Sequence, residues 1–426
     1  MLTQRQIILG ILGVILLGAL TAGGVFAWRN LRGAGPAIKP PPQDITELLN
    51  ANAQANANTS ARNTANVNTT ANINVSTQVT RNTTGFPLTL PAGYSISVLA
   101  KDLPVARDIT VDSAGNLWVS LLSDGKVVKL EIKDGKVTKR TNVFTGLGSP
   151  HGLAFDPENP AMLYVAQERS LARADVSAAS PKLQKILDLP NGNNHNRRTL
   201  AFGRDGRLYV SIGSTCNVCV EKDSHDATVY SLNKDGSDFK VFATGLRNAA
   251  FLAIRPADGK LWVTEMGRDL LGDNIPPDEI NIVEQGKFYG WPYCYGNNVH
   301  DTSFDGSNTA KQKCANASPS HVNLQAHSAP LGLAFIPTTD AWPTDWQGDL
   351  LVGFHGSWNR TQPTGYKVVR IEVNADGSTG EVRDFITGWL TKDGALGRPV
   401  DVFPTDDGTL YISDDKAGLV YVVTKS

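Results

Sequence analysis

The chain has 426 residues and a nearly balanced charge, with 40 Lys and Arg against 41 Asp and Glu. It contains no basic run or stripe, which argues against nucleic acid as a partner, because phosphate backbones are bound by clustered cations. The 40 Gly and 23 Pro predict many short turns and few long helices. A chain of this length can form one domain when it is built by repetition, so we expect an all-β repeat protein.

The N-terminus carries an apolar segment from Ile7 to Trp28 that contains no charged residue. Its length is about that needed to cross a bilayer. We predict that residues 1–32 form an uncleaved, single-pass membrane anchor, with Val25–Ala27 as a weak signal-peptidase site in the alternative interpretation. Arginines flank the segment on both sides, so charge does not decide its orientation.

A compositionally biased segment follows, rich first in Pro and then in Asn, Thr and Ala. It has too few large apolar side chains to form a core, and we predict a disordered linker over residues 33–85. Residues 86–426 are predicted to form a single folded domain.

A pattern of short apolar strand, turn and second apolar strand recurs six times in this domain. Asp-Gly or Ala-Gly occupies several of the turns, as expected for hairpins. Because six hairpins in an open sheet would expose unpaired edges, the repeats predict a six-bladed β-propeller. The copies are ITVDSAGNLWVS from Ile109, LAFDPENPAMLYVA from Leu153, LAFGRDGRLYVS from Leu200, LAIRPADGKLWVT from Leu252, LAFIPTTDAWPTDWQGDLLVG from Leu333 and VDVFPTDDGTLYIS from Val400.

Two further segments complete the predicted architecture. Tyr94 to Leu99 alternates between polar and apolar residues and is expected to close the ring against the last repeat, which ends in GLVYVV. The longer interval before the fifth repeat contains Cys294 and Cys314, and we predict a loop there that a disulfide pins to one face.

The four cysteines fall into two local pairs, Cys216 with Cys219 in CNVC, and Cys294 with Cys314. We predict two structural disulfides, which require an oxidising compartment. Redox or haem chemistry at CNVC is the alternative, but no His follows Cys219 and no βαβ pattern surrounds the motif. A zinc site also stays open, although it lacks a second closely spaced pair.

The residues just before or at the start of each inner strand should converge at one mouth of the channel. A cluster of Arg and His with few carboxylates is costly unless an anion lies between them, so the cluster predicts a polyanionic ligand. Any one of these residues could instead satisfy a turn. The positions are Arg107, His151, His195, Arg247, Asn248, His327, Ser328 and Arg398.

The segment after the fourth repeat, EMGRDLLGDNIPPDEIN from Glu265 to Asn281, concentrates Gly, Pro and Asp in one loop. Its carbonyls and carboxylates suit a hard cation such as calcium better than zinc. An ordinary solvated loop explains the same composition.

Several motifs resemble the pyrroloquinoline-quinone-dependent glucose, aldose sugar and sorbosone dehydrogenases. The resemblance covers about residues 86–426, and the HSAPLG and HGSWNR forms are closer to the sorbosone dehydrogenase branch. The motifs are HNRRTLAFGRDGRLYVSIG from His195, GLRNAAFLAI from Gly245, DEINIVEQGKFYGWP from Asp278, HSAPLGLAF from His327, FHGSWNR from Phe354 and GRPVDVF from Gly397.

The resemblance implies a six-bladed propeller that holds the quinone, a tricarboxylate, over its channel with a bound calcium ion. His195 would be the general base and Arg247 would polarise the quinone oxygen. Asn248, Arg398 and His327 would contact the cofactor. Calcium would be held by the carbonyls of Gly267 and Arg268, with Asp278 nearby.

Two departures from the family pattern concern the cofactor. Val400 stands where glucose dehydrogenases have a second Arg, and FHGSWNR stands where they have a Lys. We therefore expect His355 or Arg360 to supply the missing contact, with Arg360 preferred for its charge.

The predicted function is oxidation of aldose sugars or sugar aldehydes, with electrons passed to an external acceptor, a membrane quinone or a cytochrome. The propeller would lie outside the cytoplasm, in the periplasm or beyond it, tethered to the cell membrane. Two alternatives remain: a calcium-dependent sugar lactonase, and a propeller that only binds glycans or proteins.

Overall fold

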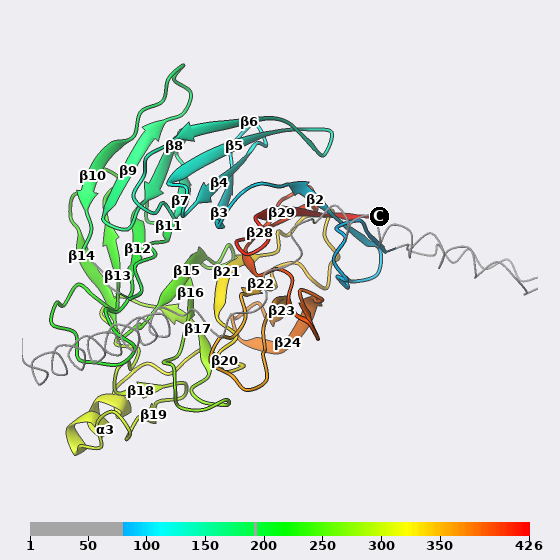
Figure 1. The fold of residues 1–426 in the computed structure, drawn as a ribbon. Helices are drawn as coiled ribbons and strands as arrows, with labels where there is room; N and C mark the ends of the chain where they lie inside the picture. Colours follow the sequence, from blue (N-terminus) through cyan, green and yellow to red (C-terminus); the bar gives the residue numbers. More distant parts are fainter. Residues whose placement is uncertain (1–79, 191–193) are drawn as a thin grey trace, which may run out of the picture. The chain divides into compact units, whose positions relative to one another are not determined.

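The computed structural model describes residues 80–190 and 194–426 (Figure 1). The chain divides into two units, residues 1–43 and 44–426, and every described residue belongs to the second. The predicted anchor and residues 33–79 of the predicted linker lie outside the described residues. Within the described ranges, no helix is long and apolar enough to cross a membrane.

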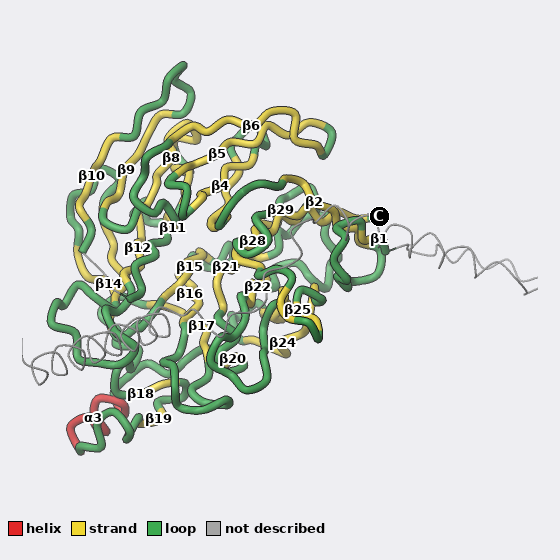
Figure 2. Tube along the Cα trace, in the orientation of Figure 1, coloured by secondary structure: helices red, strands yellow, loops and turns green. Residues whose placement is uncertain are grey.

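The described residues form six sheets arranged as blades, antiparallel except for one short edge pair, which confirms the predicted six-bladed all-β propeller (Figures 1 and 2). Each blade begins with an inner strand and runs outward. Blades one to three consist of β3 (Ala106–Val111), β4 (Leu117–Leu121), β5 (Lys126–Lys133) and β6 (Lys136–Phe144); β7 (Leu153–Asp156), β8 (Asn159–Ala166), β9 (Ser170–Asp175) and β10 (Gln184–Asp188); and β11 (Leu200–Phe202), β12 (Leu208–Ile212), β13 (Thr228–Leu232) and β14 (Lys240–Thr244).

The remaining blades follow the same plan. Blades four to six consist of β15 (Ala249–Ile254), β16 (Leu261–Glu265), β17 (Asp278–Val283) and β20 (Val322–Leu324); β21 (Pro330–Phe335), β22 (Leu350–Phe354), β23 (Lys367–Val373) and β24 (Thr379–Ile386); and β27 (Pro399–Pro404), β28 (Leu410–Asp414), β29 (Leu419–Lys425), β2 (Tyr94–Ala100) and β1 (Arg81–Asn82). Two short strands, β25 (Leu390–Thr391) and β26 (Gly394–Ala395), pair to form a separate small sheet.

The ring closes through β2, which pairs antiparallel with β29 and completes the last blade (Figure 1). The predicted pairing of Tyr94–Leu99 with the last repeat is therefore confirmed. Next to it, β1 pairs in parallel with β2, so this edge strand lies within the segment that the sequence assigned to the linker. The inner strands also contact one another in turn around the ring, from β3 through β7, β11, β15 and β21 to β27 and back to β3.

The second strand of each blade carries the core. All five residues of β4, β12, β16, β22 and β28 are buried, as expected for strands covered on both faces by neighbouring blades. Large side chains such as Trp118 and Trp262 are fully buried there. Burial between blades therefore supplies the apolar stabilisation that a single four-stranded sheet lacks.

The interval between β17 and β20 forms a small structure of its own rather than a simple loop. It contains β18 (Cys294–Tyr295), β19 (Val299–His300) and α3 (Asn308–Ala315), the red segment of Figure 2. Ser307 caps the helix by accepting a hydrogen bond from the Ala310 N–H. The predicted Cys294–Cys314 disulfide joins this helix to β18.

Candidate active site

A cavity of about 290 Å³ lies where the inner strands begin. Each blade contributes to its wall, because the wall includes Arg107, His151, His195, Arg247, His327 and Arg398. Among the predicted site residues, Asn248, Gly267, Asp278 and His355 also line it. The structure therefore brings most of the predicted residues to one place.

Local backbone irregularity helps to aim these side chains. Four inner strands shift register against their neighbours within their first few residues, as β-bulges do next to many binding sites. The shifts lie between Ala106 and Ile109, between Ala249 and Phe251, between Pro330 and Leu333, and between Pro399 and Val402.

His195 lies just before β11 and is held by the segment that follows β12. Its Nδ1 is 2.8 Å from Ser214 Oγ, and its backbone N–H donates to the Ser214 carbonyl. Gly213 allows this approach, because a Cβ there would lie 2.5 Å from the Cβ of His195. Burial, and then the charge of Arg247, holds the pKa of His195 well below its usual value, so the imidazole is neutral near pH 7.

Arg247 is buried and bound entirely by protein oxygens. Its Nε donates to the Asn217 carbonyl at 2.8 Å, and its Nη2 donates to Asn217 Oδ1 at 2.8 Å and to Asp269 Oδ2 at 2.9 Å. Its Nη1 donates to the carbonyls of Met266 and Gly267. These five acceptors match the five N–H groups of a guanidinium, so Arg247 presents a fixed positive charge to the cavity.

The positive charges at the cavity exceed the carboxylates that pair with them. Asp415 pairs with Arg107 at 2.7 Å, and its other carboxylate oxygen lies 2.8 Å from Nε2 of His355. Among the described residues, Arg197 and Arg398 form no ion pair with a carboxylate within 4.0 Å, and both line the cavity.

The same positive potential is visible in the pKa values of neighbouring groups. Burial, and then the charge of Arg107, lowers the pKa of Arg197 to about 10. Burial, and then the charge of Arg398, lowers the pKa of His355 to about 4. The cavity is therefore suited to an anion.

The loop after β16 provides oxygens on one side of the cavity. Asp278 accepts hydrogen bonds from the N–H groups of Gly267 and Ala329, at 3.0 and 2.9 Å, and burial raises its pKa to about 7. Asp278 therefore ties two loops together at the cavity wall. The Gly267 carbonyl, predicted to ligate calcium, accepts a hydrogen bond from Arg247 in this structure.

Three predicted residues are not part of the cavity wall. Ser328 is fully buried, and its hydroxyl donates to the Gln325 carbonyl. Arg360 donates to the carbonyls of Gln362 and Ala326 instead. Arg268 pairs with Asp301 at 2.8 Å and borders a neighbouring small cavity. His327 does line the cavity, but its Nε2 lies 2.8 Å from the Gly272 carbonyl and so anchors the 272–275 loop.

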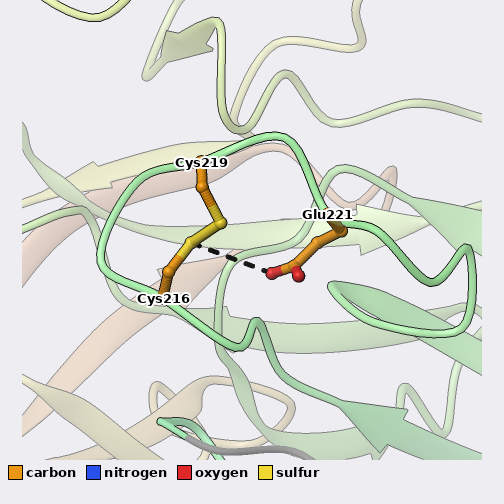
Figure 3. Close-up of side chains that lie close together, drawn as sticks. All are labelled: Cys216, Cys219 and Glu221. Atoms are coloured by element: carbon orange, nitrogen blue, oxygen red, sulfur yellow. Dashed lines mark hydrogen bonds between the residues drawn. A yellow bond between two sulfur atoms is a disulfide. The ribbon is translucent and has the colours of Figure 1, made fainter.

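The ligand atoms of Cys216, Cys219 and Glu221 lie within 4.8 Å of one another, which is a spacing that a metal site can have (Figure 3). The two sulfurs form a disulfide, as the sequence predicted, and therefore offer no thiolate to a metal. The zinc and haem alternatives for CNVC do not fit this bonding.

Comparison with known proteins assigns the chain to a family. Residues 88–426 match the model of the family described as TrAA12-like. The chain belongs to the TrAA12-like family. A Borreliella burgdorferi protein with the name "Uncharacterized protein" is 28% identical over 358 residues, which cover 79% of this chain and 90% of that protein.

Other relatives of this TrAA12-like chain are named as quinone-dependent sugar dehydrogenases. The pyrroloquinoline quinone-dependent pyranose dehydrogenase of Coprinopsis cinerea is 25% identical over 410 residues, which cover 80% of this chain but only 55% of that enzyme. The holo structure of its PQQ domain superposes with a TM-score of 0.69 at 22% identity, covering 80% of this chain and 97% of the domain. A calcium structure of the Trichoderma reesei AA12 enzyme gives a TM-score of 0.70 at 21% identity, over 80% of this chain and 98% of that one. These relatives support an oxidoreductase.

Several residues at the cavity were not predicted from the sequence. Arg197, Asp269, Trp358 and Asn359 line the cavity, although each lies within a motif that was already singled out. Asn217, which accepts a hydrogen bond from Arg247, carries no signal in CNVC beside the two cysteines. The four cavity residues lie close in sequence to predicted site residues, and that position, rather than their residue type, could have predicted them.

Proposed function

We propose that the chain oxidises aldose sugars or sugar aldehydes with pyrroloquinoline quinone bound in the cavity. The observation that carries this proposal is the excess of cationic side chains around a cavity of about 290 Å³. That volume is near the lower end of the roughly 300–1,000 Å³ typical of small-molecule sites. The named activities of the relatives point in the same direction.

The residues present fit a planar tricarboxylate. Arg197 and Arg398 have no carboxylate partner among the described residues, and their guanidinium groups can bind carboxylates in a bidentate manner. Asn248 adds an amide to the same wall. The quinone, when bound, supplies a hydride acceptor that amino-acid side chains lack.

His195 is the proposed general base. Its Nδ1 is occupied by Ser214, whereas its Nε2 has no hydrogen-bond partner in the described part of the chain. A neutral imidazole at the cavity wall can take the proton from a sugar hydroxyl at Nε2. Arg247 lies close enough to lower the pKa of His195, and its fixed charge stabilises negative charge that develops beside it.

We also propose a calcium ion at the side of the cavity formed by residues 267–278. The carbonyls of Gly267 and Arg268 would bind the ion, and Asp278 would hold the Gly267 peptide in place through its N–H. The Trichoderma reesei relative whose structure is named for calcium supports this part of the proposal.

The location is proposed from the apolar segment and the two disulfides. An uncleaved anchor at residues 1–32 would leave the propeller on the outer side of the cell membrane, where disulfides persist. Electrons would pass to an external membrane quinone or cytochrome. Protease added to intact spheroplasts should release the propeller, and protection of the propeller would place it inside.

The activity is tested by titrating the purified full chain with pyrroloquinoline quinone and calcium, then adding aldoses and a reducible dye. Quinone binding followed by sugar-dependent dye reduction is the expected result, with His195→Gln as the catalytic control. A protein that binds no quinone would overturn the proposal in favour of a binding propeller. Hydrolysis of sugar lactones without dye reduction would favour a lactonase.

A further inference from the structure

The segment from Ser214 to Glu221 contacts both proposed catalytic residues. The Ser214 N–H donates to the Arg247 carbonyl at 2.7 Å, and the Ser214 carbonyl accepts from the His195 N–H at 3.1 Å. One residue thus joins the backbones of the two residues, which belong to the starts of adjacent blades. The side chains of this segment extend the connection.

Ser214 determines which nitrogen of His195 carries the proton. Its hydroxyl has a single proton, which it donates to the Cys216 carbonyl at 2.7 Å, because a carbonyl oxygen can only accept. Ser214 Oγ must therefore accept at its 2.8 Å contact with His195, so the proton is on Nδ1. This tautomer leaves the lone pair on Nε2, as a base facing the cavity needs.

Asn217 holds the guanidinium of Arg247 from one edge. The carbonyl and the side-chain Oδ1 of this one residue accept from Nε and Nη2, both at 2.8 Å. The same Oδ1 accepts from the Asp269 N–H at 2.8 Å, and Nδ2 donates to the Asp269 carbonyl. Asn217 therefore fixes Arg247 and its carboxylate partner relative to each other.

A disulfide and a pair of hydrogen bonds hold the conformation of the Ser214–Glu221 segment. The Cys216–Cys219 disulfide encloses Asn217, and the Glu221 carboxylate accepts from both the N–H and the hydroxyl of Thr215, at 2.7 and 2.6 Å. Figure 3 shows the Glu221 carboxylate facing Cys216 across the loop. A four-residue ring leaves the Cys216 and Asn217 carbonyls little freedom to turn away from their partners.

We infer that the Cys216–Cys219 loop is a positioning element for the reaction: the Cys216 carbonyl, through Ser214, sets the tautomer of His195, and Asn217 orients Arg247. The inference rests on the proposed function for its catalytic consequence. Its structural content concerns the protein without any cofactor, and it can be tested there.

The tautomer is measured first, in the cofactor-free full-length protein labelled with ¹⁵N-histidine. The chain has 7 His, and the signal that disappears in His195→Gln identifies His195. We expect protonated Nδ1 and unprotonated Nε2 in the wild type, and a mixture in Ser214→Ala. Ser211→Ala is the matched control, because it removes an equally buried hydroxyl that bonds to Thr199 instead. A wild-type His195 protonated on Nε2 would overturn the inference.

Kinetics then separate positioning from folding. Since general-base catalysis contributes roughly 10²- to 10⁴-fold, we expect Ser214→Ala to lower kcat by about tenfold or more while KM and quinone affinity change little. Asn217→Ala should lower kcat and speed hydrogen exchange at Arg247 Nη2, which donates to the side-chain Oδ1 of Asn217. Asn217→Asp, which keeps the acceptor oxygen for Nη2 but loses the Nδ2 donor to the Asp269 carbonyl, should recover part of both. Wild-type kcat and exchange in Asn217→Ala would contradict the role of Asn217.

The disulfide is tested by the double variant Cys216→Ser with Cys219→Ser, with Cys294→Ser and Cys314→Ser as the control pair. The first should mix the His195 tautomers and lower kcat, whereas the second should lower only thermal stability. An unchanged tautomer and kcat in the first variant would exclude the closure as part of the positioning element. If the wild type binds no quinone, the proposed function fails, and the tautomer spectra still decide the inference.

Discussion

The two halves of the central channel differ in chemistry although the same six inner strands line both. Where the strands begin, Arg and His side chains surround a cavity of about 290 Å³. Further along the strands lies a larger cavity of about 530 Å³, and five blades each contribute a phenylalanine to it: Phe155, Phe202, Phe251, Phe335 and Phe403.

The chemical difference between the two halves of the channel reflects where their residues lie in the sequence repeat. Phe155, Phe202, Phe335 and Phe403 lie near the end of the first strand of their repeats and so recur in four blades, whereas Phe251 lies just before the fourth repeat. The Arg and His residues lie at the N-terminal border of the repeat, where the copies diverge. Residues that recur thus build the ring, and residues that vary from one blade to the next build the site.

The largest effect is expected for a substitution at the cavity lined by Arg and His, which we call the cationic half of the channel. His195→Gln removes the proposed proton acceptor and should lower kcat by roughly 10²- to 10⁴-fold while quinone affinity persists. Dye-coupled turnover and a quinone titration measure the two effects. His300→Gln, in the insertion and outside both cavities, is the control, and wild-type turnover by His195→Gln would remove His195 from its role.

A substitution at the larger cavity, which we call the apolar half of the channel, should change the free energy of unfolding instead. Leu333 is buried and lines the larger cavity, so Leu333→Ala should lower the free energy of unfolding by about 2–5 kcal/mol. Chemical denaturation measures this loss. The quinone affinity of the folded variant should stay at the wild-type value, and a parallel loss of affinity would mean that the two halves are not independent.

Arg398→Lys sharpens the comparison within the cationic half. Lys keeps the charge but lacks the planar fork, so quinone affinity should fall by about tenfold, which corresponds to about 1.4 kcal/mol. Isothermal titration measures the affinity. Arg383→Lys, on the outer strand β24, should bind as the wild type does, and equal affinity in the two variants would exclude bidentate binding by Arg398.

A pH-dependent effect is expected from two carboxyls that line the larger cavity, Asp108 and Asp401. Burial raises both pKa values, that of Asp401 to about 7, so the folded state keeps protons that the unfolded chain has released. Their contribution to stability is full below the unfolded pKa and is lost as the pH rises through about 7. The free energy of unfolding should therefore fall between pH 6.5 and pH 8, by at most about 1.4 kcal/mol per pH unit for each proton involved.

Denaturation at several pH values tests this prediction, with Asp401→Asn expected to flatten the decline. Burial raises the pKa values of Asp278 and Glu279 to about 7 as well, which adds to the effect. The buried histidines act in the opposite direction but only below about pH 6.5, because their pKa values are lowered. Stability that rises from pH 6.5 to pH 8 would contradict the assignment.

The sequence was sufficient to predict the blades, because hairpin repeats and radial closure follow from local patterns. Even the closing strand at Tyr94 could be predicted from its alternation. The start of each inner strand also identified a residue of the cavity wall in every blade. In contrast, Ser214 and Asn217 lie in a connection after β12, and their contacts to His195 and Arg247 depend on loop geometry that residue types do not reveal.

The placement of Arg360 shows the same limit. Charge alone favoured it as a substitute for a missing Lys, yet it lies outside the wall, while His355 from the same motif lines it. Which of two neighbouring residues faces a cavity depends on the path of a loop. Propensity and charge do not determine that path.

The pairing of β2 with β29 has a consequence for how the protein is made. Ser95 and Ser426, which bond to each other at 2.6 Å, are 331 positions apart in the chain, so β2 is synthesised long before β29, the strand with which it pairs. Until then the edges of β2 and β28 are unpaired, and such edges invite association with other chains. A chain that loses even its final strand cannot shut the ring, so premature termination near residue 419 should yield an aggregating product rather than a smaller propeller.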